Sequence, residues 1–484
     1  MIFSSPIFLF GFLPIVLLLY YSSPRVMKNV ILLLSSLFFY TWGEVFYVLV
    51  MVASIFSNYF FGWLLYNKQK KQQKRKIYIS VGITVNLALL FFFKYANFII
   101  DNVNKLLSTV NVAPVHLDTI HLPLGISFFT FQAVSYLVDV YRKDVPAQKN
   151  ILNLSLYISL FPQLIAGPIV RYHDIIPQLN HRTHSFNLFS SGVQRFIYGL
   201  AKKMLLANSL GEVADLIFAL SGNDLTLLLA WIGIFSYTLQ IYFDFSGYSD
   251  MAVGLGRMFG FRFQENFNYP YIARSLREFW RRWHISLSTW FRDYLYIPLG
   301  GSRVSTGRVY MNLLTVFILT GLWHGADWNF LFWGLFHGVF LAAEHAGLSR
   351  ILKKIGTPMQ HMYALTVVVT GWVFFRTETF AQAFDYLYAM INLYNYQTTT
   401  LQFAQVFSSE AIYAFVAASM LSMPVYAWIK TKIATKTGLI FDKYTVTNFF
   451  LIKIPKLGFA SLLLFLSIVK IASSTYNPFI YFRF

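Results

Sequence analysis

The sequence contains no cysteine, and charged residues make up only 12% of its 484 positions. The missing cysteine excludes disulfide bonds, thiolate catalysis and cysteine-ligated metal sites. The charged fraction is about half of what soluble domains carry. Because 57% of the residues are hydrophobic, the interior of a soluble globule could not hold all of their side chains. The composition therefore predicts a polytopic integral membrane protein.

Acidic residues are also scarce, since 20 Asp and Glu stand against 39 Lys and Arg and leave a net charge of +19. In a soluble protein this excess would suggest a nucleic-acid partner. In a membrane protein it first indicates that Lys and Arg gather on cytoplasmic loops. No basic segment precedes the first apolar run and no small-residue cleavage site follows it. We therefore expect a retained first helix and not a removed signal peptide.

Apolar segments suited to membrane helices occur along the whole chain. At about 1.5 Å per residue, each is long enough, or nearly so, to cross a hydrocarbon core of about 30 Å. Two further segments, 124–140 and 193–220, could be spans, re-entrant hairpins or buried helices. We predict one all-α membrane domain over residues 1–484, a bundle of about 10 to 13 spanning or re-entrant helices. The apolar segments lie near 6–21, 29–42, 44–66, 77–93, 151–170, 226–243, 309–323, 327–345, 362–376, 411–429 and 457–473.

Loop charge predicts the orientation of the chain. The basic loops 68–76 and 346–361 contain no acidic residue, and 430–456 contains only Asp442, so we place all three in the cytoplasm. Segment 377–410 has three acidic residues and no Lys or Arg, as expected of an exported loop. Both termini then lie on the exported side, which requires an even number of complete crossings.

Polar chemistry interrupts the apolar pattern first in RSLREFWRRWHISLSTWFRDYLYIPLGGSR, residues 274–303. On one continuous helix, spacings of three and four would bring guanidinium, imidazole and hydroxyl groups onto one face beside tryptophan. Arginine forks suit phosphate, which acyl-CoA carries. The arginines taken alone are better explained as basic anchors of an interfacial helix. The candidate substrate-binding and catalytic residues here are Arg277, Trp280, Arg281, Arg282, His284 and Ser288.

The second polar region is LTGLWHGADWNFLFWGLFHG, which contains Trp323, His324, Asp327 and His337. We expect His324 at the end of an outward-running span and His337 in the helix that returns. An ionisable group at membrane depth is costly and is often functional. A lone histidine is more often hydrogen-bonded between helices, but two beside an Asp favour a functional site. With His284 these residues could ligate a metal, yet their spacings match no metal motif, so we predict none.

Imidazole supplies a base that titrates near neutral pH, able to deprotonate a hydroxyl as it attacks an activated acyl group. The sequence contains no G-x-S-x-G elbow, no Walker loop and no H-E-x-x-H motif. Hydrolase, NTPase and zinc-protease functions are therefore unsupported.

Together, FWRRWHISLSTWFRDYLYIPLGG and the later LWHGADW resemble the membrane-bound O-acyltransferases. The resemblance is greatest to the bacterial branch that includes alginate O-acetyltransferase and the teichoic acid D-alanyl transfer protein. Three more stretches fit, namely PLGISFFTFQAVSYLVDVYR, FPQLIAGPIVRYHDI and YFDFSGYSDMAVGLGRMFGF. The N-terminal MIFSSPIFLFGFLPIVLLLYY fits the alginate type, and the core motifs span residues 120–345.

This resemblance implies a many-helix bundle with a central tunnel in the bacterial cytoplasmic (inner) membrane. It implies that His324 is the catalytic histidine and that His284 occupies the family's second polar position. The closest subgroup transfers acetyl, from acetyl-CoA as the expected donor, to an exported polysaccharide of the alginate, peptidoglycan or cellulose type. It works with an exported partner of the SGNH-hydrolase type. No bound cofactor is implied.

The chain ends in YNPFIYFRF, residues 476–484. A similar aromatic ending occurs on a small partner of the D-alanylation system, so Tyr481 is a candidate acyl carrier. An interfacial aromatic anchor explains the ending equally well. Two other functions stay open for the whole protein. One is D-alanyl or lipid O-acyl transfer on the same fold, and the other is a transporter with histidine proton relays.

Overall fold

The computed structural model describes residues 1–67, 72–165, 167–393, 406–425, 428 and 454–478. Within these ranges the chain consists of helices and their connections, without a β-strand. This confirms the predicted all-α class. The N-terminal half contains η1 Ile7–Phe12, α1 Leu13–Ser22, η2 Arg25–Met27, α2 Lys28–Thr41, α3 Val48–Asn67, α4 Gln72–Thr109, α5 Ile126–Arg142, α6 Ile151–Ser159, α7 Phe161–Leu164, α8 Tyr172–Asn180, α9 Phe186–Ala201, η3 Lys202–Ala207, α10 Asn208–Phe218 and η4 Gly222–Asp224.

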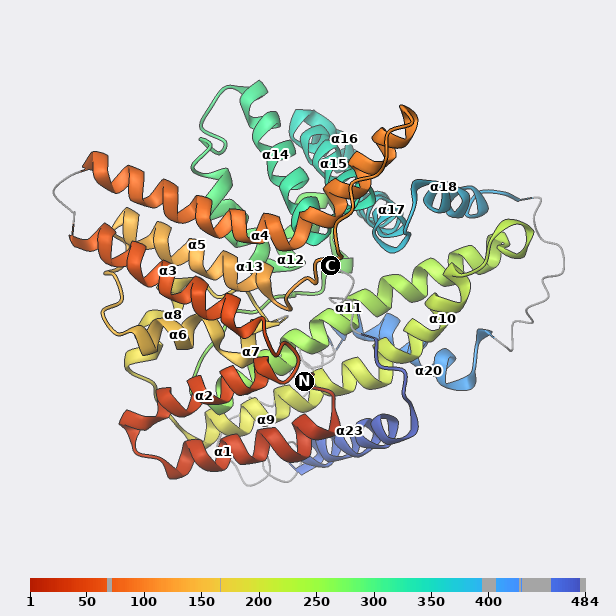
Figure 1. Cartoon of the computed structure of the whole chain (residues 1–484). Helices are drawn as coiled ribbons and strands as arrows, with labels where there is room; N and C mark the ends of the chain where they lie inside the picture. Colours follow the sequence, from red (N-terminus) through yellow and green to blue (C-terminus); the bar gives the residue numbers. More distant parts are fainter. Residues whose placement is uncertain (68–71, 166, 394–405, 426–427, 429–453, 479–484) are drawn as a thin grey trace.

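The second half begins with the long helix α11, Leu227–Met258, which runs through the middle of the bundle (Figure 1). Helices α1, α2, α9 and α23 lie on one side of it, and α14 to α17 lie on the other. After α11 come η5 Pro270–Ile272, α12 Leu276–Arg282, α13 Ile285–Phe291, η6 Arg292–Tyr296, α14 Thr306–His324, α15 Trp328–Ala343, η7 Glu344–Leu348, α16 Ser349–Lys354, α17 Thr357–Arg376, α18 Phe380–Ala389, α20 Ser409–Leu421 and α23 Ile454–Ser473.

Small residues bring α9 and α11 into close contact. A Cβ atom on Gly199 would lie 2.5 Å from the carbonyl oxygen of Gly247, so only glycine fits there. The most apolar stretch of α11 is 72% buried, compared with 22% for α4 and 11% for α23. α11 is therefore a core helix, whereas α4 and α23 leave most of their surface for lipid.

Four helices among the described residues are long and apolar enough to cross a membrane by length and composition, namely α3, α4, α11 and α23. The apolar segment 151–170 is divided into α6 and α7, because Leu160 leaves the helical conformation just before Pro162. The ambiguous segment 193–220 contains the end of α9, the π-helix η3 and α10. Short and broken helices thus lie in the middle of the chain, and the total number of spans stays a prediction.

The two ends of the described chain meet inside the bundle. After α23, the segment 474–478 runs back against the N-terminus, where the Asn477 side-chain amide donates to the Ser4 hydroxyl at 3.1 Å. The Tyr476 hydroxyl donates to the Asp215 carboxylate at 2.6 Å. The Asn477–Ser4 contact brings the two ends of the described chain together, and the side of the membrane on which they lie stays a prediction.

Candidate active site

His324 is the last residue of α14, and Asp327 begins the next helix, α15. The Asp327 carboxylate accepts a hydrogen bond from the Asn329 backbone at 2.7 Å, which is the ordinary role of an N-cap. The two helices pack so closely that a Cβ atom on Gly321 would lie 2.3 Å from the Phe330 carbonyl oxygen. This tight hairpin fixes the position of His324 at its turn.

The imidazole of His324 is buried in an aromatic cage, with only 5% of the residue exposed. Its ring centroid lies 5.0 Å from that of Trp323 and 5.2 Å from those of Trp333 and Phe375. His337 is also buried, but its ring packs against Trp333 on another side. Trp333 therefore contacts both histidines.

His284 lies at a break between α12 and α13, in the left-handed region at φ 44°. Its Nδ1 is 3.2 Å from the side-chain oxygen of Asn266, which also accepts from the Ser286 backbone at 3.1 Å. Because that oxygen can only accept, Nδ1 carries the proton and Nε2 is the basic nitrogen of the neutral ring. The His284 ring lies 4.6 Å from Phe245 and 5.9 Å from Trp323. A buried amide thus orients this imidazole beside the neighbour of His324.

The expectation of one continuous helix through residues 277–291 is wrong. The Asn268 amide donates to the Arg282 carbonyl and the Ile285 amide donates to the Asn266 carbonyl, each at 2.9 Å. These bonds replace the helical bonds at the junction, so the chain turns between α12 and α13. His284 consequently leaves the face that the other candidates share.

Four of the remaining candidates of this region, all except Arg282, do come together. They line a pocket of about 210 Å³, here called the arginine pocket, with α14 as its far wall. Its lining residues include Arg277, Trp280, Arg281, Ser288, Phe291, Phe317 and Thr320.

Arg277 and Arg281 are exposed, and no hydrogen bond or ion pair is found for either guanidinium within the described part of the chain. Arg282 differs, because it pairs with Glu278 at 2.8 Å and donates to the Asn268 carbonyl at 3.0 Å. The arginine pocket therefore presents two uncompensated cations, and Arg282 does not line it.

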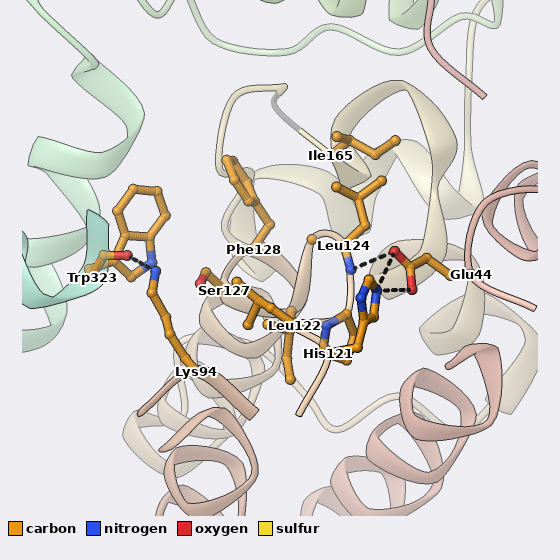
Figure 2. A pocket seen from close by; sticks show the side chains of 12 residues that line it. Glu44, Lys94, His121, Leu122, Leu124, Ser127, Phe128, Ile165 and Trp323 are labelled. Carbon is orange, nitrogen blue, oxygen red and sulfur yellow. Dashed lines mark hydrogen bonds and ion pairs between the residues drawn. The ribbon is translucent and has the colours of Figure 1, made fainter. Parts of the chain in front are cut away.

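A second pocket, of about 390 Å³, lies against Trp323 and is here called the lysine pocket (Figure 2). Lys94 and Trp323 form one side, Glu44 and His121 form the other, and Phe128 lies between them. His121 Nε2 is 3.2 Å from the Glu44 carboxylate, which also accepts from the Leu124 backbone at 3.2 Å.

Lys94 reaches from α4 to the end of α14. Its ammonium group donates to the Trp323 carbonyl and, at 3.3 Å, to the His324 carbonyl. The neighbouring Tyr95 hydroxyl donates to the Leu322 carbonyl at 2.6 Å. These carbonyls have no partner within the helix, and a cation there also suits the helix dipole. α4 therefore holds the backbone that carries His324.

A third pocket, of about 370 Å³, shares Lys94 with the lysine pocket. Asp327 and Trp328 line it, together with Asp101 and Asn102 of α4. Thr320 lines the arginine pocket and Trp323 lines the lysine pocket, about one helical turn apart. The last turns of α14 thus line two different pockets, the arginine pocket first and the lysine pocket one turn later.

Sequence reasoning missed Lys94, Glu44, His121 and Asn266. A lysine in the apolar run LLFFFKYANF was the available signal for Lys94, since buried charge is costly. Tyr481 lies outside the described residues. Within the described ranges, no group of three or more His, Asp or Glu side chains is placed to hold a metal ion.

Comparisons with known proteins found a matching family model and relatives that cover the whole chain. A family model described as the membrane-bound O-acyltransferase family matches residues 32–380. The chain is 42% identical to a probable alginate O-acetylase of Azotobacter vinelandii over 100% of both chains. It is 36% identical to a peptidoglycan O-acetyltransferase of Helicobacter pylori, over 81% of this chain and 80% of that protein. It is 29% identical to a teichoic acid D-alanyltransferase of Bacillus subtilis, over 45% of this chain and 58% of that protein.

Proposed function

Because this chain belongs to the membrane-bound O-acyltransferase family and is an O-acyltransferase, we propose that it moves acetyl from cytoplasmic acetyl-CoA to the hydroxyl of an exported polysaccharide. The observation that carries the proposal is the position of His324 on α14, whose last turns line the arginine pocket and then the lysine pocket. A donor and an acceptor that enter from opposite sides could meet at that residue.

The donor side is the arginine pocket. Acetyl-CoA carries phosphate groups, and arginine guanidinium groups bind phosphate through paired charge-assisted hydrogen bonds. Among the residues that the structure describes, no internal acceptor competes for Arg277 or Arg281. The pocket is also lined by aromatic residues, which suits an acyl thioester arm.

The acceptor side consists of the lysine pocket and the third pocket, which shares Lys94 with it. Aromatic rings of Trp323, Phe128 and Trp328 lie there beside carboxylates and amides. Hydroxyl-rich acceptors suit such a mixture, because carboxylates and amides bind hydroxyls and aromatic faces cover apolar ring surfaces. Polysaccharide acceptors are named for the alginate and peptidoglycan relatives, which match more of the chain than the D-alanyltransferase does.

The reaction follows from these positions. His324 accepts the proton of the attacking hydroxyl, whose oxygen forms a bond to the thioester carbonyl carbon. The carbon–sulfur bond breaks, and the leaving CoA thiolate takes the proton from the imidazolium. His284 stabilises the positive charge that develops on the His324 imidazolium, because Asn266 orients its ring and leaves Nε2 as the basic nitrogen. We propose that an exported partner of the SGNH type is one route by which the acetyl group reaches the polymer.

Reconstituted protein with labelled acetyl-CoA tests this function. We expect label on an added oligosaccharide or exported partner, with one free CoA released for each acetyl group transferred. D-alanyl transfer predicts label only from a D-alanyl donor, and a transporter predicts uptake of the compound without cleavage. Either of those results contradicts the acetyl-transfer proposal.

The C-terminal tail is a candidate extension of the acceptor route. The segment 474–478 leading to it is held in the bundle interior, where buried Lys203 donates to the Pro478 carbonyl. We propose that Tyr481 carries acetyl as a phenolic ester between His324 and the final acceptor. Tyr481→Phe should abolish polysaccharide acetylation in cells, whereas Phe482→Tyr should not. Full acetylation by Tyr481→Phe would exclude Tyr481 as an acyl carrier, and the interfacial aromatic anchor would then explain the C-terminal tail.

We also propose that both termini face the exported side. Because the chain has no cysteine, single cysteines can be labelled without background. A cysteine at Ser5 should react with an impermeant maleimide in intact spheroplasts, and one at Lys353 should react only after lysis. The reverse pattern would overturn the orientation.

A further inference from the structure

A pocket of about 460 Å³ lies far from the candidate active site, where η2 and the start of α2 meet the connection between α8 and α9. This pocket, here called the basic pocket, shares no lining residue with the arginine or lysine pocket. Its lining contains cationic and polar side chains and no carboxylate, and it consists of Arg25, Lys28, Asn29, Leu179, Asn180, His181, Arg182, Thr183 and His184.

The cations of the basic pocket are held in place without a neutralising partner. The Lys28 ammonium lies 4.7 Å from the ring centroid of Tyr20 and 5.0 Å from that of Tyr21. The Arg182 guanidinium donates to the Asn29 side-chain oxygen at 2.7 Å and lies 4.3 Å from the Phe261 ring centroid. Aromatic faces thus supply most of the local attraction.

No Asp or Glu lies within 4.0 Å of the Arg25, Lys28 or Arg182 side chains among the residues that the structure describes. The surrounding field is positive, as the adjacent histidine shows. Burial first, and then Lys28, Arg182 and Arg25, lower the pKa of His184 from its usual value. A bound anion would relieve the repulsion among these groups.

Exposed apolar side chains on the elements next to the basic pocket, η2, α1 and α9, form what is here called its apolar rim. Val26 lies beside Arg25 and is 87% exposed, and Phe186 follows the histidine segment and is 84% exposed. Leu18, on the last turns of α1, is 70% exposed. A soluble anion needs only the cations, whereas a ligand with both a phosphate and acyl chains uses the cations and this rim together.

We propose that the basic pocket binds the phosphate headgroup of an anionic phospholipid. Arg25 and Lys28 contact the phosphate, Arg182 and Asn29 form the fixed floor, and the acyl chains lie along Val26 and Leu18. Basic clusters at the end of membrane helices attract anionic lipid in this way, and each cation contributes a similar share of the binding energy. The proposal does not depend on which acyl group the enzyme transfers.

The test uses purified full-length protein in dodecyl maltoside, titrated with dioleoyl phosphatidylglycerol or dioleoyl phosphatidylcholine. Bound lipid is counted by native mass spectrometry, and the melting temperature is recorded in parallel. Wild type should bind phosphatidylglycerol saturably and in preference to phosphatidylcholine. Arg25→Gln combined with Lys28→Gln should weaken that binding about 25-fold, because the loss of each cation lowers the affinity about fivefold.

Two matched variants keep the test decisive. Lys149→Gln is the control, because the Lys149 ammonium also lies over a tyrosine ring, 5.8 Å from the centroid of Tyr66, and Lys149 does not line the basic pocket. It should bind phosphatidylglycerol as wild type does. Lys28→Arg keeps the charge and should keep the affinity, which separates loss of charge from misfolding of the double variant.

Three results would overturn the proposal. Equal binding of the two lipids would show that headgroup charge is not recognised. Unchanged binding by the double variant would place the lipid elsewhere. Sodium phosphate or CoA that stabilises the protein as strongly as phosphatidylglycerol, with loss of the effect in the double variant, would make this a soluble-phosphate site.

Discussion

The arginine pocket and the lysine pocket meet the same helix about one turn apart, yet their charges are arranged differently. In the lysine pocket, Lys94 binds two backbone carbonyls and Glu44 binds His121, so each charge has an internal partner. In the arginine pocket, Arg277 and Arg281 have no such partner within the described residues. Partnered charges hold the protein's own geometry, whereas unpartnered charges are available to a ligand.

The largest effect should come from His324, which follows Trp323 of the lysine pocket and lies about one turn beyond Thr320 of the arginine pocket. His324→Gln removes the general base while filling most of the space, and should lower acetyl transfer by about 10²–10⁴-fold. His337→Gln is the matched control, since His337 is also a buried histidine of this helix pair and its ring also packs against Trp333. It should alter the melting temperature more than the rate. Wild-type acetylation by His324→Gln would contradict the assignment.

The unpartnered arginines should affect donor binding next most strongly. Replacing Arg277 and Arg281 together by Gln should raise the KM for acetyl-CoA about 10- to 100-fold, because two charge-assisted phosphate contacts are lost. Arg282→Gln removes the same charge from a residue that pairs with Glu278 and should change this KM little. Equal effects from both replacements would mean that the arginines act as interfacial anchors.

A smaller loss is expected at the helix break. His284→Ala and Asn266→Ala should each lower kcat about 10-fold or more, since Asn266 orients the imidazole. Because the two residues act through one contact, the double variant should be little worse than either single variant. Additive losses in this cycle would show that Asn266 acts independently of His284.

The smallest effect should come from the partnered lysine. Lys94→Met keeps the side chain's length but leaves the Trp323 and His324 carbonyls without their donor. We expect kcat to fall about tenfold or less while the KM for acetyl-CoA stays constant. Lys76→Met, a change near the exposed start of the same helix and away from the pockets described above, should change neither. If Lys94→Met raised the KM for acetyl-CoA, the lysine pocket would also take part in donor binding, and the assignment of separate donor and acceptor pockets would be wrong.

The membrane class and the approximate position of most helices follow from hydropathy, because lipid-facing helices such as α4 and α23 each contain a long apolar stretch. The grouping of Arg277 and Arg281 also follows from helical spacing within α12, whereas Ser288 joins them in the pocket although the chain turns between α12 and α13. The break at His284 could not be predicted, because it depends on Asn266, a residue distant in sequence. Lys94 was missed for the same reason, since its carbonyl partners lie on α14.

The closure between segment 474–478 and Ser4 determines the order of assembly. The ribosome makes Ser4 first and Asn477 473 residues later, so the contact can form only after the chain between them has been synthesised. Until then Asp215 and Lys203 wait without their C-terminal partners. A chain that terminates before residue 476 would therefore lack the partners that Tyr476, Asn477 and Pro478 give to Asp215, Ser4 and Lys203, and quality-control proteases can recognise such exposed polar groups.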